Sequence, residues 1–199
     1  MPDWYRNTEW SPAIAQDFEA RLARSRGQKA QYLSLQGLAL VPKHADVAAG
    51  LLHRVVERGD PHETVRALAT LATAYLAQGN VEGALETYEA ALERQIVQPN
   101  VVAVQPADYL FVIGYFRAAS RIPAAVVIAE AMQDDGIFGP DPQVLAAKAL
   151  VFDLAGRRAE ARAAAAKALP MVDELGDGEA LGVNVAELRA RLAEIGEAA

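Results

Sequence analysis

The residue types that most often perform chemistry in proteins are sparse in this chain, and their spacing is unfavourable. Cysteine is absent, which excludes disulfides, thiolate metal sites and cysteine nucleophiles. His44, His53 and His62 recur every nine residues, a spacing that does not place two imidazoles on one helical face. His53 and Glu57 lie one helical turn apart, but without further ligands we interpret them as a surface pair or a packed imidazole. We therefore expect no metal and no cofactor.

Two other patterns that could indicate chemistry are incomplete. No serine lies in a nucleophile-elbow pattern or has a base apparent in the sequence. The acidic segment from Asp173 to Glu179 matches a calcium loop at its first, fifth and sixth positions, but Leu175 stands where an oxygen ligand is needed and Asn184 replaces the closing glutamate. We interpret this segment as a solvated connection and predict that the protein is not an enzyme.

The composition restricts the class of partner. The chain has 199 residues, is 52% hydrophobic and carries a formal net charge of -7, so a substantial core is expected and a nucleic-acid partner is not. One basic cluster, Arg21, Arg24, Arg26 and Lys29, is interpreted as a solvated helix face. No apolar run approaches the roughly 20 residues that span a bilayer, and the first ten residues lack the features of a secretory signal. We expect no membrane partner and a cytoplasmic location.

The periodicity of the apolar residues predicts an all-α protein. Apolar side chains recur at three and four rather than at two, which indicates about ten helical segments and no convincing strand. Ser11 before Pro12 marks a helix start, Asn184 with Glu187 marks another, and Pro170 is expected to end a helix. The expected helices cover residues 12–25, 28–40, 45–57, 62–78, 81–95, 106–119, 123–132, 145–154 and 159–169, and a last one begins near residue 184.

The segment from Leu68 to Leu92 contains two short amphipathic helices hinged at Gly79-Asn80. If Val65 is the first position of a unit of 34 residues, the packing positions fall on Leu68, Leu71, Ala72, Tyr75, Ala84, Tyr88 and Ala91. The small residues at the eighth, twentieth and twenty-seventh positions allow two helices to approach closely. This pattern resembles the tetratricopeptide repeat family.

Weaker units start at Ala30, Gln105 and Pro142, the last with Lys148 at a position that is usually large and apolar. The resemblance implies an α-solenoid of antiparallel helix pairs, a tetratricopeptide-like superhelix with capping helices at both ends. We predict one domain over residues 1–199, with the aromatic residues Trp4, Tyr5 and Trp10 folded back as a cap or serving as an anchor for a partner. Its parts are an N-terminal cap and helix (1–29), a degenerate repeat (30–64), the best repeat (65–98), a second degenerate repeat (105–138), a fair repeat (142–175) and a C-terminal capping helix (183–199).

The resemblance also implies a concave groove lined by the first helix of each pair. The implied lining is mostly apolar and comprises Ser34, Leu38, Arg66, Thr73, Leu76, Tyr109, Ile113, Phe116, Arg117, Leu150 and Asp153. A clamp for acidic tails is not expected, because Ser34, Ala69 and Ala146 stand where the family's lysine would lie.

Three functional hypotheses stay open. The leading one is a non-catalytic module that binds a partner protein or peptide through the groove, as an adaptor, chaperone or immunity-type protein. The second is a small-molecule sensor with a pocket between repeats, using Tyr109, Tyr115, Arg117 and Arg121; a charged ligand would require more than one converging arginine. The third is a self-associating structural subunit, such as a homodimer, whose groove is filled by a second copy or by the final helix.

Overall fold

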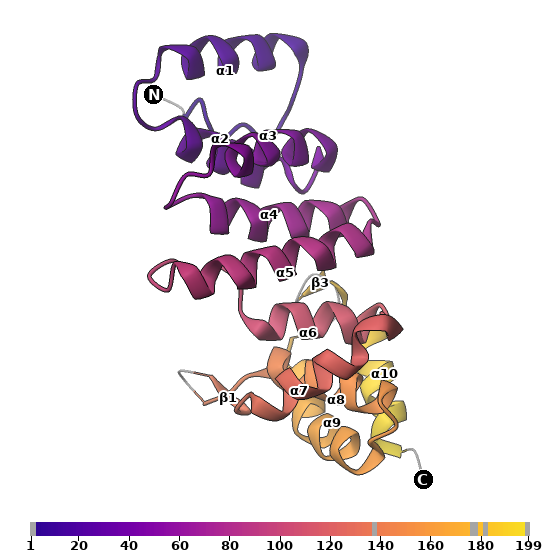
Figure 1. Ribbon diagram of the computed structural model, residues 1–199. Coiled ribbons are helices and arrows are strands. Elements are labelled where there is room, and N and C mark those ends of the chain that lie inside the picture. The colour runs from indigo at the N-terminus through magenta and orange to yellow at the C-terminus, as the bar shows by residue number, and fades with distance from the viewer. Residues whose placement is uncertain (1–2, 137–138, 176–178, 181–182, 198–199) are drawn as a thin grey trace. The chain divides into compact units, whose positions relative to one another are not determined.

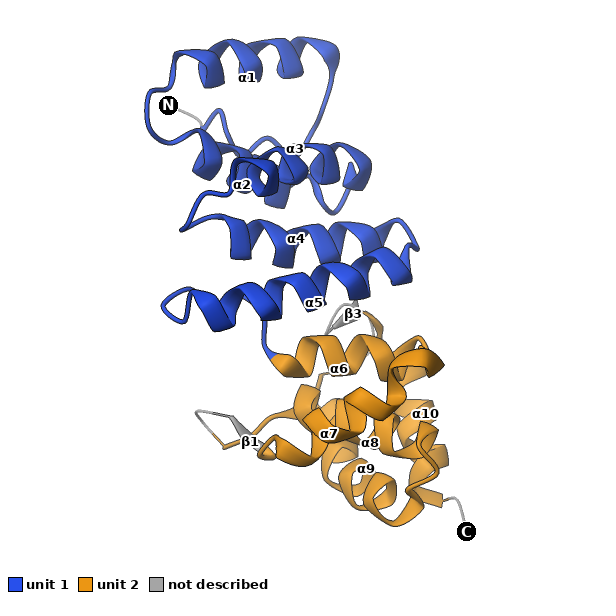
Figure 2. Cartoon of the chain, viewed as in Figure 1, with its two compact units in different colours: residues 1–105 blue, residues 106–199 orange. Residues whose placement is uncertain are grey.

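The computed structural model describes residues 3–136, 139–175, 179–180 and 183–197, and within these ranges the protein is all-α apart from two minimal hairpins (Figure 1). Ten α-helices follow one another, and most pack against a sequence neighbour in antiparallel orientation. Contacts group the chain into two compact units, residues 1–105 and 106–199 (Figure 2). None of the helices in the described ranges has the length and apolarity needed to cross a membrane.

Unit 1 contains the first five helices, and the sequence predicted each of their ends to within two residues. They are α1 (Pro12–Arg24), α2 (Lys29–Leu40), α3 (Ala45–Arg58), α4 (Thr64–Ala77) and α5 (Val81–Val97). The predicted cap of α1 is confirmed, because the Ser11 hydroxyl accepts a hydrogen bond from the backbone N–H of Ile14 at 3.3 Å. The predicted hinge between α4 and α5 is confirmed as well. Gly79 has a φ of 72°, and the Asn80 side chain accepts from the N–H of Gly83 at 3.0 Å.

The pair α4 and α5 shows the packing that the best repeat predicted. Ala72, Ala84 and Ala91 are fully buried, as close helix packing requires. Tyr88 is buried, and the half-buried Tyr75 has its hydroxyl 2.7 Å from Nε2 of His53 on α3. His53, which the sequence analysis interpreted as a surface or packed residue, is therefore hydrogen-bonded to Tyr75 on the neighbouring helix α4.

The N-terminal aromatic residues dock on the first helical layer. The ring of Trp4 lies 4.9 Å from that of Tyr32 and 5.5 Å from that of Phe18, measured between centroids. The segment is also held by the fully buried Gln36 of α2, whose Oε1 accepts from the backbone N–H of Asn7 at 3.1 Å and whose Nε2 donates to the Asn7 carbonyl at 2.7 Å. The predicted docking of this aromatic segment is confirmed.

Unit 2 contains α6 (Pro106–Tyr115), the 3-10 turn η1 (Ala119–Arg121), α7 (Ile122–Ala131), α8 (Pro142–Leu154), α9 (Arg158–Asp173) and α10 (Val185–Glu197). Two antiparallel hairpins join helices in this unit: β1 (Asp135–Gly136) with β2 (Gly139–Pro140), and β3 (Glu179–Ala180) with β4 (Val183–Asn184). The expectation of no strand is wrong at these four short segments. Two residues are too few to produce an alternating pattern in the sequence.

The third helix pair departs from a regular hairpin. α6 packs mainly against α8, whereas α7 makes lighter contacts with both. The close approach of α6 and α8 requires a glycine, since a Cβ at Gly114 would lie 2.6 Å from Cβ of Leu150. In the weaker unit that starts at Gln105, the twentieth and twenty-seventh positions, where small residues should allow close packing, are Ala124 and Ala131; both are exposed.

Three expected helix ends are corrected. α8 begins at Pro142 rather than at residue 145, because the Asp141 side chain caps it by accepting from the N–H groups of Gln143 and Val144. α6 ends at Tyr115 rather than near residue 119, because Arg117 takes a left-handed conformation with a φ of 57°. α9 continues through Pro170 to Asp173, and its last turn is anchored by the fully buried Val172. The Asn184 cap of α10 is confirmed by a hydrogen bond of 3.1 Å from the N–H of Glu187.

Candidate functional site

The sequence-predicted lining falls into two places, one in each unit. In unit 1 the side chains of Leu38, Arg66 and Thr73 are exposed, and that of Leu76 is half-buried. Ser34, on the same helix as Leu38, is buried and offers little surface to a partner. We define the α2–α4 face as Leu38, Arg66, Thr73 and Leu76. These residues lie on α2 and α4, which contact each other.

The α2–α4 face exposes a large apolar side chain, that of Leu38. Leu38 is 56% exposed, near the C-terminal end of α2. Arg66 is the face's one charged residue, and the Thr73 hydroxyl is occupied by a hydrogen bond of 3.2 Å to the Ala69 carbonyl of its own helix. The face therefore combines apolar surface with a single positive charge.

In unit 2 the predicted lining separates into buried and exposed residues. Tyr109, Ile113 and Leu150 are buried, so a partner cannot reach them in this conformation. Phe116, Arg117 and Asp153 are exposed. The burial of the first three follows from their position in the core of unit 2, where α6 and α8 approach closely.

The C-terminal end of α6, next to these exposed residues, contacts the last helix, which the sequence analysis treated only as a cap. Arg191 of α10 donates hydrogen bonds to the carbonyl oxygens of Tyr115, at 2.6 Å, and Gly114, at 3.1 Å. Its guanidinium also lies 5.1 Å from the centroid of the Tyr115 ring. Arg191 thereby binds two carbonyls at the end of α6, which a helix leaves without partners of its own.

The ionisation of this region reflects its packing. Burial, followed by the nearby charge of Arg117, lowers the pKa of Arg191 from its ordinary value. Burial, followed by a hydrogen bond with Glu187, raises the pKa of Tyr115 to about 12. Arg117 is therefore close enough to Arg191 to influence the ionisation of Arg191.

A polar cleft of about 190 Å³ lies beside Arg191. It is lined by Arg117, Asp153, Arg191, Glu194 and Ile195. We name it the α6–α8–α10 cleft, because Arg117 closely follows α6 and the other four residues lie on α8 and α10. Sequence reasoning found Arg117 and Asp153 but missed Arg191 and Glu194. No signal in the sequence places α10 against the end of α6. The other three residues of the sensor hypothesis, Tyr109, Tyr115 and Arg121, are not among the lining residues of this cleft.

Comparison with family models, curated proteins and solved structures finds no match to this chain. Functional inference therefore rests on the residues themselves.

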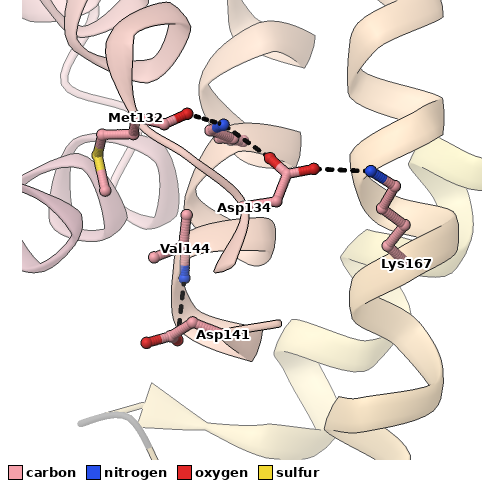
Figure 3. Close-up of polar contacts among 6 residues, drawn as sticks. Met132, Asp134, Asp141, Val144 and Lys167 are labelled. Carbon is pink, nitrogen blue, oxygen red and sulfur yellow. Dashed lines mark hydrogen bonds and ion pairs between the residues drawn. The ribbon is translucent and has the colours of Figure 1, made fainter. Parts of the chain in front are cut away.

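A second charged cluster in unit 2 has a structural explanation. Lys148, which is 8% exposed, donates to Oδ1 of Asp134 at 2.7 Å and to the Met132 carbonyl, and Lys167 of α9 donates to the other Asp134 oxygen at 2.7 Å (Figure 3). These hydrogen bonds, Lys148 first, lower the pKa of the Asp134 carboxyl. The lysine that departs from the repeat pattern thus anchors the connection between α7 and α8.

No cluster of metal ligands emerges from the residues described. The part of the chain that the structure describes contains no group of three or more metal-ligating side chains. The acidic segment after Asp173 lies partly outside the described residues, so the expectation that it is a solvated connection stays a prediction.

Proposed function

We propose that this chain is a non-catalytic binding module that takes up a segment of another protein on the α2–α4 face. The observation that carries the proposal is the 56% exposure of Leu38 on a face with one charged residue. A partner helix with apolar side chains at every third or fourth position would cover Leu38 and Leu76, and an acidic residue on it would pair with Arg66. The close packing of α4 against α5, with Ala72, Ala84 and Ala91 fully buried, supports the same role, because a closely packed helix pair holds its outer surface rigid.

The expected contribution of Leu38 to the free energy of partner binding is modest but measurable. Complete burial of a leucine side chain stabilises a complex by about 1.5–3 kcal/mol. Since roughly half of Leu38 is already buried, its contribution should be about 1–2 kcal/mol. Leu38→Asp should therefore weaken partner binding by roughly 5- to 30-fold or more.

The test places a photoreactive amino acid at Leu38 in one variant and at Val127 in a control, and irradiates each in host cells. Val127 on α7 is 64% exposed, so it matches Leu38 in type and accessibility. A protein that crosslinks from position 38 alone is then purified and titrated against wild type, Leu38→Asp and Val127→Asp by calorimetry. We expect weaker binding only for Leu38→Asp, with unchanged thermal unfolding. Equal crosslinking from both positions, equal affinity of the two variants, or crosslinking only to a second copy of the chain would contradict the proposal.

A further inference from the structure

The α6–α8–α10 cleft has a charge composition that differs from the rest of the molecule. Two guanidinium groups, those of Arg117 and Arg191, and two carboxylates, those of Asp153 and Glu194, surround it, so its walls carry no net charge in a chain whose formal charge is -7. Ile195 supplies the apolar part of the lining. At about 190 Å³ the cleft is smaller than the roughly 300–1,000 Å³ of sites that hold drug-sized ligands. Its ligand must be small.

One arginine of the cleft is fixed in place. The two terminal nitrogens of Arg191 are held by the carbonyls of Gly114 and Tyr115, and the ring of Tyr115 lies beside the guanidinium. The Nε–H of Arg191 has no hydrogen-bond partner within the described residues. A guanidinium held in this way loses little further freedom when it binds a carboxylate.

The other arginine occupies a position that favours glycine. Among the described residues Arg117 is the one non-glycine with a positive φ, at 57°, whereas Gly59, Gly79 and Gly156 take the same conformation just after α3, α4 and α8. The left-handed conformation costs an L-residue with a side chain more free energy than glycine. Strain retained at such a position is a sign of function when a second observation supports it. Here the second observation is that Arg117 lines the cleft.

The charged groups of the cleft stand apart instead of neutralising one another. Arg117 and Asp153 both influence the pKa of Arg191 through space. Nevertheless, Arg117, Asp153 and Glu194 make no ion pair with any residue that the structure describes. Space for a ligand therefore lies between groups of opposite charge, and three of them, Arg117, Asp153 and Glu194, have no ion-pair partner among the described residues.

We propose that the α6–α8–α10 cleft binds a free α-amino acid. Its carboxylate would lie between the guanidiniums of Arg117 and Arg191, and its ammonium would pair with Asp153 and Glu194. A simple anion fits less well, because the same walls carry two carboxylates and the whole chain is acidic. This site is separate from the α2–α4 face and does not depend on it.

The test follows the side-chain Nε–H signals of the arginines by NMR in the full-length ¹⁵N-labelled protein. Each proteinogenic amino acid is titrated in turn, together with the N-acetyl and the carboxamide derivatives of any that bind, and inorganic phosphate serves as the anion probe. We expect saturable shifts at Arg117 and Arg191 for at least one free amino acid, and binding weakened by roughly tenfold or more for both derivatives. If the N-acetyl derivative or phosphate bound as tightly as the free amino acid, the proposal would be overturned. The absence of saturable shifts at Arg117 and Arg191 with every amino acid would also overturn it.

Arg117→Gly tests the site in a variant whose fold should be at least as stable as that of wild type. Glycine relieves the backbone at this position, so the variant should unfold at a higher temperature than wild type while its amino-acid affinity falls by roughly tenfold. Glu194→Gln, at an exposed position, should weaken binding without changing stability. Arg66→Ala, outside the cleft, is the matched control. Full affinity in Arg117→Gly would show that the arginine is not part of a ligand site. Neither result bears on partner binding at Leu38, so the two proposals can fail separately.

Discussion

Arg191 in the last helix binds the backbone of Tyr115 at the end of the first helix of its unit. The guanidinium donates a hydrogen bond of 2.6 Å to the Tyr115 carbonyl and lies 5.1 Å from the centroid of its ring. The final carbonyls of an α-helix lack intrahelical partners and carry partial negative charge, so a cation is favourable there. This contact connects two residues that are 76 positions apart in the sequence.

Loss of this cation should destabilise unit 2. Arg191→Met retains much of the packing volume but leaves the carbonyls of Gly114 and Tyr115 without their charged donor. We expect the free energy of unfolding to fall by about 1–3 kcal/mol, measured by urea denaturation. Arg66→Met, at an exposed position of α4, should change it by less than about 0.5 kcal/mol. Equal effects of the two substitutions would mean that the contact with α6 does not contribute to stability.

Tyr115 should titrate at unusually high pH. Burial is the main cause that raises its pKa from 10.0 to about 12, and a hydrogen bond with Glu187 is the second. As pH rises, the unfolded chain releases this proton first, so the stability from the protonated side chain is complete below pH 10 and is lost as pH rises through about 12. The measurement is phenolate absorbance, with Tyr115→Phe subtracted to isolate this side chain. Glu187→Gln should lower the pKa only partly, because burial persists; a wild-type value near 10 would contradict the packing described.

Most of unit 1 could be predicted from the sequence because its signals are local. Ser11 and Asn80 cap helices by bonding to backbone groups three residues away, and Gly79 supplies the one conformation that its turn needs. The alanines at the contact of α4 with α5 follow a regular spacing. Information of this kind is contained within a single helix hairpin.

The cleft of unit 2 could not be predicted, because contacts between distant residues build it. Half of its charged lining, Arg191 and Glu194, comes from α10, which the capping pattern at Asn184 located in the sequence but not in space. The packing of α6 on α8 rather than α7 depends on the fit of Gly114 against Leu150, which no periodicity reveals. A repeat pattern predicts that consecutive helices pack together, whereas here α6 packs mainly on α8 and only lightly on α7.

Substitution of Asp134 should lower the free energy of unfolding more than substitution of its partner Lys148. Asp134→Ala leaves the buried ammonium of Lys148 without its carboxylate, and we expect a loss of about 1–3 kcal/mol in the free energy of unfolding. Lys148→Met fills similar volume and leaves Asp134 paired with Lys167, so it should cost less. Chemical denaturation of both variants measures the difference. A larger cost for Lys148→Met would indicate that the hydrogen bond from the ammonium to the Met132 carbonyl matters more than its pairing with Asp134.

The contribution of Asp134 should also disappear in acid. Because its pKa is lowered from 3.8 in the folded protein, the stabilisation is present above pH 3.8 and is lost as pH falls through the lower, folded-state value. The stability difference between wild type and Asp134→Ala should therefore narrow below pH 3.8. A difference that stays constant across this range would show that the carboxylate is not the source of the effect.

Gln36 should control whether the N-terminal aromatic segment stays docked. Its side-chain amide is fully buried and binds both the N–H and the carbonyl of Asn7, so Gln36→Leu leaves two backbone groups without partners. The chain's two tryptophans, Trp4 and Trp10, both lie in this segment, so tryptophan fluorescence reports its position. We expect a red shift in emission from Gln36→Leu at temperatures where circular dichroism still shows native helix content. Gln31→Leu, at an exposed position of the same helix, is the matched control and should leave the emission unchanged. If both variants emit as wild type does, aromatic packing against Phe18 and Tyr32 holds the segment without the amide.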